Sequence, residues 1–251
     1  MNGNYDNKND FYSINLEKIL FLDVETVPMR ASFDELPEIF KPLWEKKVDR
    51  LSQQEEKPAK DLFFEKAGIY AEFGKIICVS AGFFHTAAND EKVFRVKAFS
   101  NDDEKQLLSE FKQMLEEHFN SPNNFLCGHN GKEFDFPYLS RRMLINDIKL
   151  PYLLNNFAKK PWETRFLDTM DLWKFGDFKN YTSLDLMAAV FDIPTPKDDI
   201  SGKDVANVYW NENDLQRIAD YCNKDVITTA RLFLKYRGEQ DLKDEEIIIT
   251  G

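Results

Sequence analysis

Lys18-Ile-Leu-Phe-Leu-Asp-Val-Glu25 (KILFLDVE) is the stretch of sequence that decides the fold. Its apolar run is almost continuous, which is typical of a strand buried on both faces of a sheet. Pro28 follows shortly and ends the pattern. Asp23 and Glu25 stand two residues apart, so on a strand their carboxylates leave the same face. Such a pair either marks the exit of the strand into solvent or binds a cation, because burying unpaired carboxylates is unfavourable.

The segments after this strand predict a mixed sheet with helices on its faces, an α/β architecture in one domain spanning 1–251 with a core at about 17–236. Residues 30–66 are charged, contain three prolines and show helical spacing, which indicates a helical insertion. The β-branched and aromatic runs 75–84 and 91–99 predict an antiparallel hairpin. Further elements are expected as a helix opening at 102, a strand at 125–130, and helices at 135–147, 183–191 and 214–236.

Composition and charge narrow the class of protein. The 251 residues are 43% hydrophobic and 14% aromatic, which indicates a globular chain and not a disordered one. The net charge of −11 argues against a broad basic surface for coating duplex nucleic acid, but it is compatible with a carboxylate cluster and a small footprint on a strand end. No apolar stretch reaches membrane-helix length, and the polar N-terminus lacks a signal-peptide layout, so no membrane partner is expected.

The three cysteines, Cys78, Cys127 and Cys222, are odd in number and far apart in the chain. This pattern argues against a disulfide framework and against a cysteine-based zinc site. The sequence therefore predicts a reduced, cytoplasmic protein.

Two other acidic positions stand at the starts or faces of predicted helices. Asp135, in Asn130-Gly-Lys-Glu-Phe-Asp-Phe-Pro-Tyr138, follows a strand and opens a helix; it is either a reactive group above the sheet or an ordinary helix N-terminal acid. Tyr221 and Asp225 lie four residues apart, so a helix brings them to one face. They are either a phenol and carboxylate acting together on a water and a metal, or a core tyrosine beside an exposed acid.

Taken together, these acids predict a metal site. Mg²⁺ and Mn²⁺ prefer oxygen ligands, and a pair of such ions about 4 Å apart can activate a water and stabilise the leaving oxygen of a phosphodiester. That chemistry needs carboxylates from several elements, and Asp23, Glu25, Asp135 and Asp225 supply them.

Three motifs in order, 21–26, 130–138 and 221–225, resemble those of DEDD-type 3′–5′ exonucleases. Tyr221 is typical of the tyrosine subclass, whereas the other subclass would carry His at the position of Asp220. The second motif is similar to that of the proofreading exonuclease domain of family B DNA polymerases, and the chain looks like the bacterial stand-alone exonucleases related to that domain. No polymerase segment is expected in this chain.

The resemblance implies a ribonuclease H-like fold with a five-stranded mixed sheet flanked by helices on both faces. It implies two divalent ions, Mg²⁺ or Mn²⁺, and hydrolysis at a 3′ end with release of nucleoside 5′-monophosphates. The leading hypothesis for the substrate is single-stranded DNA or frayed 3′ ends, with a function in DNA repair. The implied metal ligands are Asp23, Glu25, Asp135 and Asp225, with Tyr221 orienting the attacking water. The implied contacts to the terminal nucleotide are Thr26, Val27, Asn130 and Phe134.

Four further residues lie outside the three motifs and have other expected roles. Asp168 in 166–173 is expected to be structural, His129 to be a satisfied strand-end residue, and Lys197 and Lys203 in the loop 192–204 to be candidates for covering the cleft. RNA is the alternative substrate, because a contact to the 2′-hydroxyl cannot be located from sequence. A non-catalytic nucleic-acid-binding module is the alternative from another class.

Overall fold

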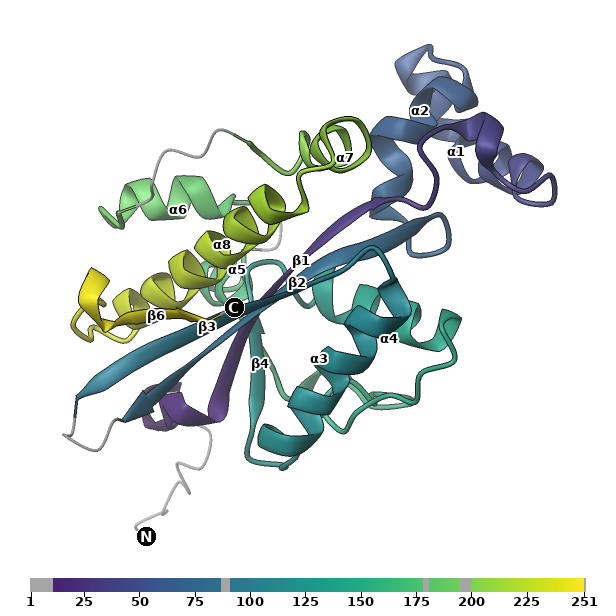
Figure 1. Ribbon diagram of the computed structural model, residues 1–251. Helices are drawn as coiled ribbons and strands as arrows, with labels where there is room; N and C mark the ends of the chain where they lie inside the picture. The colour runs from purple at the N-terminus through teal and green to yellow at the C-terminus, as the bar shows by residue number, and fades with distance from the viewer. Residues whose placement is uncertain (1–10, 87–90, 178–180, 195–199, 251) are drawn as a thin grey trace, which may run out of the picture.

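The computed structural model describes residues 11–86, 91–177, 181–194 and 200–250. Within these residues, six strands form one mixed sheet in the order β5-β4-β1-β2-β3-β6 (Figure 1). The strands are β1 (Ile19–Pro28), β2 (Gly74–Thr86), β3 (Lys92–Ser100), β4 (Phe125–Gly128), β5 (Phe166–Asp168) and β6 (Ile247–Thr250). β1 is antiparallel to β2 and parallel to β4, and β2 and β3 form the predicted antiparallel hairpin. β5 and β6 extend the two edges as parallel strands.

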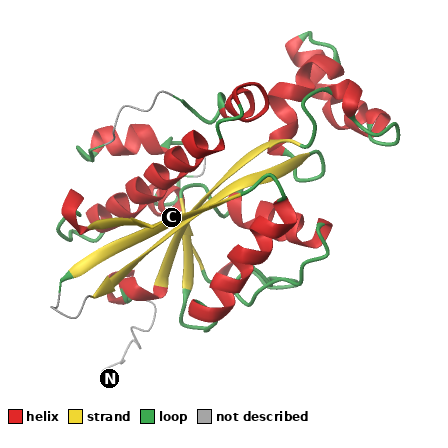
Figure 2. Cartoon of the chain, viewed as in Figure 1, coloured by secondary structure: helices red, strands yellow, loops and turns green. Residues whose placement is uncertain are grey.

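Helices cover both faces of the sheet (Figure 2). α3 and α4 lie on one face, and α8 lies on the other with α6 beyond it (Figure 1). The helices are α1 (Lys41–Glu55), α2 (Ala59–Lys66), α3 (Glu104–His118), α4 (Asp135–Ile145), α5 (Thr169–Lys174), α6 (Leu184–Val190), α7 (Val205–Asn207) and α8 (Leu215–Tyr236). This arrangement confirms the predicted ribonuclease H-like α/β fold.

The central strand β1 explains the layering, because its alternate side chains supply two separate cores. Leu20, Leu22 and Val24 point to the α3–α4 face and join the largest hydrophobic cluster. Phe21 and Val27 point to the opposite face, where α8 covers them. Each of these five side chains is at most 5% exposed, and full burial of one such side chain stabilises the fold by roughly 1.5–3 kcal/mol.

The segment 30–66, which the sequence predicts to be a helical insertion, contains α1 and α2, and these helices project past the end of the sheet where β1 finishes (Figure 1). It has its own small core around Trp44, whose ring packs edge-on against Phe63 and Phe73. The indole N–H of Trp44 donates to the carbonyl of Ala59, 2.7 Å away, which ties the two helices together. This segment is therefore a folded pair of helices and not an extended loop.

The strand count differs from the five expected. The additional strand is β6, in which Ile247 pairs with Phe94 and Thr250 with Lys97. Its β-branched run follows a charged tail, and it completes the otherwise open edge of β3. Among the described residues, none of the helices combines the length and the hydrophobicity needed to cross a bilayer.

Candidate metal centre and cleft

Asp23 and Glu25 interrupt the apolar face of β1 that lies under α8. Phe21 packs into one hydrophobic cluster on that face and Val27 into another, and the two acids fall between them. Asp23 is partly buried and Glu25 is only 8% exposed. No described residue donates a hydrogen bond to the Glu25 carboxylate or forms an ion pair with it. A buried, unpaired carboxylate is unfavourable unless it is protonated or bound to a cation.

The pKa values of Asp23 and Glu25 reflect their burial and the nearby carboxylates. Burial raises the pKa of Glu25 well above its ordinary value of 4.5, and the carboxylates of Asp23 and Asp225 raise it further. Burial also raises the pKa of Asp23 to about 7, with an added contribution from Asp135. These acids therefore repel one another in a space that excludes much of the water.

Asp135 reaches the same space from the opposite face of the sheet. It is the first residue of α4 and is 4% exposed. Burial raises its pKa to about 7, and the nearby carboxylates of Asp168 and Asp225 contribute to the rise. The backbone N–H of Val24 hydrogen-bonds its side chain and offsets part of this effect. The helix N-terminus thus directs Asp135 toward the middle of β1.

α8 supplies the remaining two predicted site residues. Tyr221 and Asp225 lie four residues apart on this helix, and their side chains are hydrogen-bonded to each other. Burial raises the pKa of Tyr221 above its ordinary range, and the carboxylates of Asp225 and Glu25 raise it further. The phenol consequently keeps its proton and donates it in a hydrogen bond to Asp225.

The structure therefore brings together side chains from three elements that are far apart in the sequence. β1, the start of α4 and the middle of α8 contribute them. The five residues are Asp23, Glu25, Asp135, Tyr221 and Asp225.

Asp168 holds the loop that precedes α4. Its buried carboxylate accepts the backbone N–H groups of Asn130 (3.0 Å), Lys132 (2.9 Å), Met170 (2.9 Å) and Asp171 (3.3 Å). This network fixes the turn that carries Asn130, whose backbone is left-handed at φ 64°. Asp168 is thus a structural acid, as expected.

Both ring nitrogens of His129 also have hydrogen-bonding partners. Its Nδ1 lies 2.8 Å from the Thr169 hydroxyl and its Nε2 lies 2.8 Å from the Thr182 carbonyl. Burial lowers the pKa of His129, so the ring is neutral at neutral pH. Both ring nitrogens are occupied, which leaves neither for a metal.

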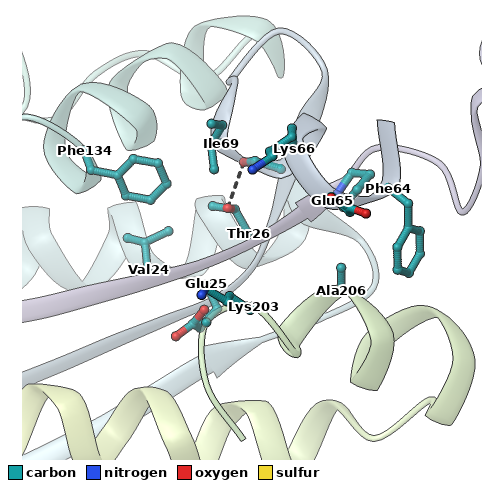
Figure 3. Close-up of a pocket in the computed structure, with 13 residues that line it drawn as sticks. Val24, Glu25, Thr26, Phe64, Glu65, Lys66, Ile69, Phe134, Lys203 and Ala206 are labelled. Carbon is teal, nitrogen blue, oxygen red and sulfur yellow. Dashed lines mark hydrogen bonds between the residues drawn. The ribbon is translucent and has the colours of Figure 1, made fainter. Parts of the chain in front are cut away.

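A cleft of about 610 Å³ has Glu25 among its lining residues (Figure 3). Glu25 and Thr26 of β1 form its floor, and the Thr26 hydroxyl donates to the Gly68 carbonyl at 2.8 Å. Phe134, just before α4, lines one side, and Lys203 lines another (Figure 3). Lys197 lies outside the described residues.

The other two residues expected at the terminal nucleotide lie differently. Val27 is 0% exposed, with its side chain in the core under α8, and it does not line the cleft. Asn130 is partly buried and does not line this cleft; its side-chain oxygen is buried without a hydrogen-bond partner among the described residues.

Sequence reasoning missed two features of this site. The outer wall of the cleft comes from the end of the insertion, through Phe64, Lys66 and Ile69. Ile69 is 53% exposed beside the cleft, a position that no periodicity in the sequence identifies. The second feature is the thiol of Cys222, which lies 3.3 Å from Oδ2 of Asp23 although nearly two hundred residues separate them.

Comparisons with known proteins identify the family and the fold of the chain. Residues 69–248 match the family described as "Predicted 3'-5' exonuclease related to the exonuclease domain of PolB". A similar solved structure is the family B DNA polymerase of the hyperthermophilic archaeon Pyrobaculum calidifontis, with a TM-score of 0.50 and 15% identity. The match covers 86% of this chain but only 24% of the polymerase, so it shows a shared fold with one part of that protein. No curated protein matches the chain.

Proposed function

We propose, because the chain belongs to the family of predicted 3′–5′ exonucleases related to the exonuclease domain of PolB, that it hydrolyses single-stranded DNA from the 3′ end with two divalent metal ions. The products would be nucleoside 5′-monophosphates. The observation that carries the proposal is the convergence of four carboxylates and one protonated phenol from β1, α4 and α8.

The donor set fits hard divalent cations. All four acids offer oxygen, which Mg²⁺ and Mn²⁺ prefer. Burial and mutual repulsion raise the pKa of Glu25, and no described cation pairs with it. A bound divalent ion would reverse both effects, because it favours the ionised carboxylates.

Each site residue has a proposed role that depends on its position. Asp23, Glu25 and Asp225 would hold one ion, and Asp23 with Asp135 the other, as the tyrosine subclass of DEDD exonucleases implies. When bound, the ions supply activation of a water and stabilisation of the leaving oxygen. Tyr221 keeps its proton on Oη and is held by Asp225, so it is suited to orient the attacking water and not to remove its proton.

The cleft offers a place for the 3′ end of one strand. Thr26 and Phe134 border it next to the carboxylates, and Phe64 of the insertion presents a ring on the far wall. An aromatic ring in such a wall can stack on a base. Lys203 adds positive charge that suits the phosphate backbone, whereas Lys66 is paired with Glu55 at 3.4 Å. The footprint is short, which agrees with the net charge of −11.

The test is a nuclease assay on 5′-labelled single-stranded DNA and RNA of the same sequence, with Mg²⁺, with Mn²⁺ and with chelator. We expect metal-dependent shortening of the DNA from its 3′ end and release of monophosphates. Asp23→Asn should abolish hydrolysis, whereas Asp220→Asn, an exposed acid on the same helix as Tyr221, should retain it.

Three other results would separate the alternatives. Shortening of RNA but not DNA would replace the proposed substrate. Binding of DNA without release of monophosphates in either metal would favour the non-catalytic module. Equal activity of the Asp23→Asn variant would contradict the assignment of the site.

A further inference from the structure

A sulfur atom lies inside the carboxylate cluster. Cys222 of α8 is fully buried, and its Sγ lies 3.3 Å from Oδ2 of Asp23. One ligand atom each from Asp23, Glu25 and Cys222 lies within 4.8 Å of the other two. Cys78, the cross-strand partner of Glu25, is in hydrogen-bonding contact with the Cys222 thiol. The three cysteines are distant in sequence, but the fold places two of them at this one point.

We propose that Asp23, Glu25 and Cys222 form a binding site for Zn²⁺ that is distinct in chemistry from an all-oxygen magnesium site. Zn²⁺ binds thiolate and carboxylate together, whereas Mg²⁺ selects oxygen alone. The Cys222 thiol transfers its proton to water as the ion binds, because the thiolate is the ligand. A water completes the tetrahedral shell.

The spacing suits such an ion. In a tetrahedral zinc site with bonds of about 2.0–2.3 Å, neighbouring ligand atoms lie about 3.3–3.8 Å apart. The Asp23–Cys222 pair already has a separation of 3.3 Å, and the other two pairs, which are at most 4.8 Å apart, need to close by at most about 1.5 Å. Side-chain rotation supplies that movement without a change in the backbone.

The burial of Glu25 also indicates that the site takes a cation. Glu25 is more than nine-tenths buried, and no described residue gives it a hydrogen bond or a counter-charge. It also borders the cleft, so an ion can reach it from solvent (Figure 3).

Cys127 shows what a purely structural cysteine looks like in this fold. It is equally buried, on β4 beside Phe21, and it joins no group of metal-ligating atoms among the described residues. It therefore provides a matched control for a change of one buried sulfur to oxygen.

Zinc at this site would also inhibit the reaction, an effect that rests on the proposed function. An ion held by Asp23 and Glu25 takes two ligands that the catalytic cations need, so Zn²⁺ would compete with Mg²⁺ or Mn²⁺ and arrest hydrolysis. The zinc site itself does not depend on hydrolysis, and it is tested without a nuclease assay.

The experiment strips the full-length protein of metal and reloads it with one equivalent of Zn²⁺ or Co²⁺. X-ray absorption at the zinc edge should show one sulfur neighbour at about 2.3 Å, and cobalt should give a thiolate charge-transfer band in the near ultraviolet. Cys222→Ser should lose both signals and bind Zn²⁺ at least about 10- to 100-fold more weakly, whereas Cys127→Ser should match the wild type.

A zinc shell of oxygen and nitrogen only in the wild-type protein would overturn the inference, and this measurement needs no variant to fold. Equal zinc affinity of the wild type and a folded Cys222→Ser protein would overturn it as well. A protein that shows the sulfur signals but fails to degrade DNA or RNA would retain the zinc site while losing the proposed function.

Discussion

Replacing Asp135 with Asn should stabilise the protein when metal is absent. Burial raises the pKa of Asp135 from 3.8 to about 7, a rise of about three. At 1.36 kcal/mol for each pH unit, keeping this group ionised in the folded state costs about 4 kcal/mol. Neighbouring carboxylates share the repulsion and respond to its loss, so we expect about half of this gain, roughly 2 kcal/mol, from Asp135→Asn.

The pH dependence gives the sign of this effect. The folded pKa of Asp135 lies above its unfolded value, so its contribution to stability is fully present below about pH 3.8 and is lost as the pH rises through about 7. The advantage of the Asn variant should therefore be near zero at about pH 4 and full at about pH 8.

Thermal unfolding in chelator, followed from about pH 5 to about pH 8, measures this. For a chain of this length, 2 kcal/mol corresponds to about 4–8 °C in melting temperature. Asp220→Asn, which changes an exposed acid, should not differ from the wild type at any pH. A variant that melts below the wild type at about pH 8, or a gain independent of pH, would refute the electrostatic reasoning.

Three further substitutions each remove a single contact in the site or in its supporting structure. Tyr221→Phe should lower kcat at least about 100-fold while leaving the melting temperature nearly unchanged, because it removes one hydroxyl near the proposed water; unchanged kcat would exclude that role. Arg142→Ala should destabilise by about 3–5 kcal/mol in denaturant unfolding, because it leaves the buried Glu104 unpaired; a loss under about 1 kcal/mol would contradict this. Asp168→Ala should leave the backbone N–H groups of Asn130 and Lys132 without an acceptor and lower the free energy of unfolding by at least about 2 kcal/mol. Amide exchange at these two residues should become faster, and unchanged exchange would argue against this role of Asp168.

Much of the fold follows from local patterns in the sequence. The apolar run of β1, the hairpin of β2 and β3, and the spacing of α3, α4 and α8 each match a predicted element. Tyr221 and Asp225 share a face because helical geometry requires it. The additional strand β6 was not predicted, because three consecutive isoleucines in a charged tail have no partner until β3 is placed beside them.

Only part of the candidate site could likewise be predicted from the sequence. Asp23 and Glu25 could be assigned to one face of a strand because side chains alternate there. The contact of Cys222 with Asp23 depends on how α8 crosses β1, which no local pattern contains. The cleft wall from Phe64 and Ile69 likewise depends on the direction in which the insertion leaves the sheet. The side chain of Val27 is turned into the core by the same alternation that exposes Thr26.

The most direct test of the central claim is the anomalous scattering of manganese in crystals soaked with Mn²⁺. The convergence of acids from β1, α4 and α8 predicts a pair of peaks among Asp23, Glu25, Asp135 and Asp225. Crystals that diffract well, contain Mn²⁺ at high concentration and show no anomalous peak between these carboxylates would contradict it.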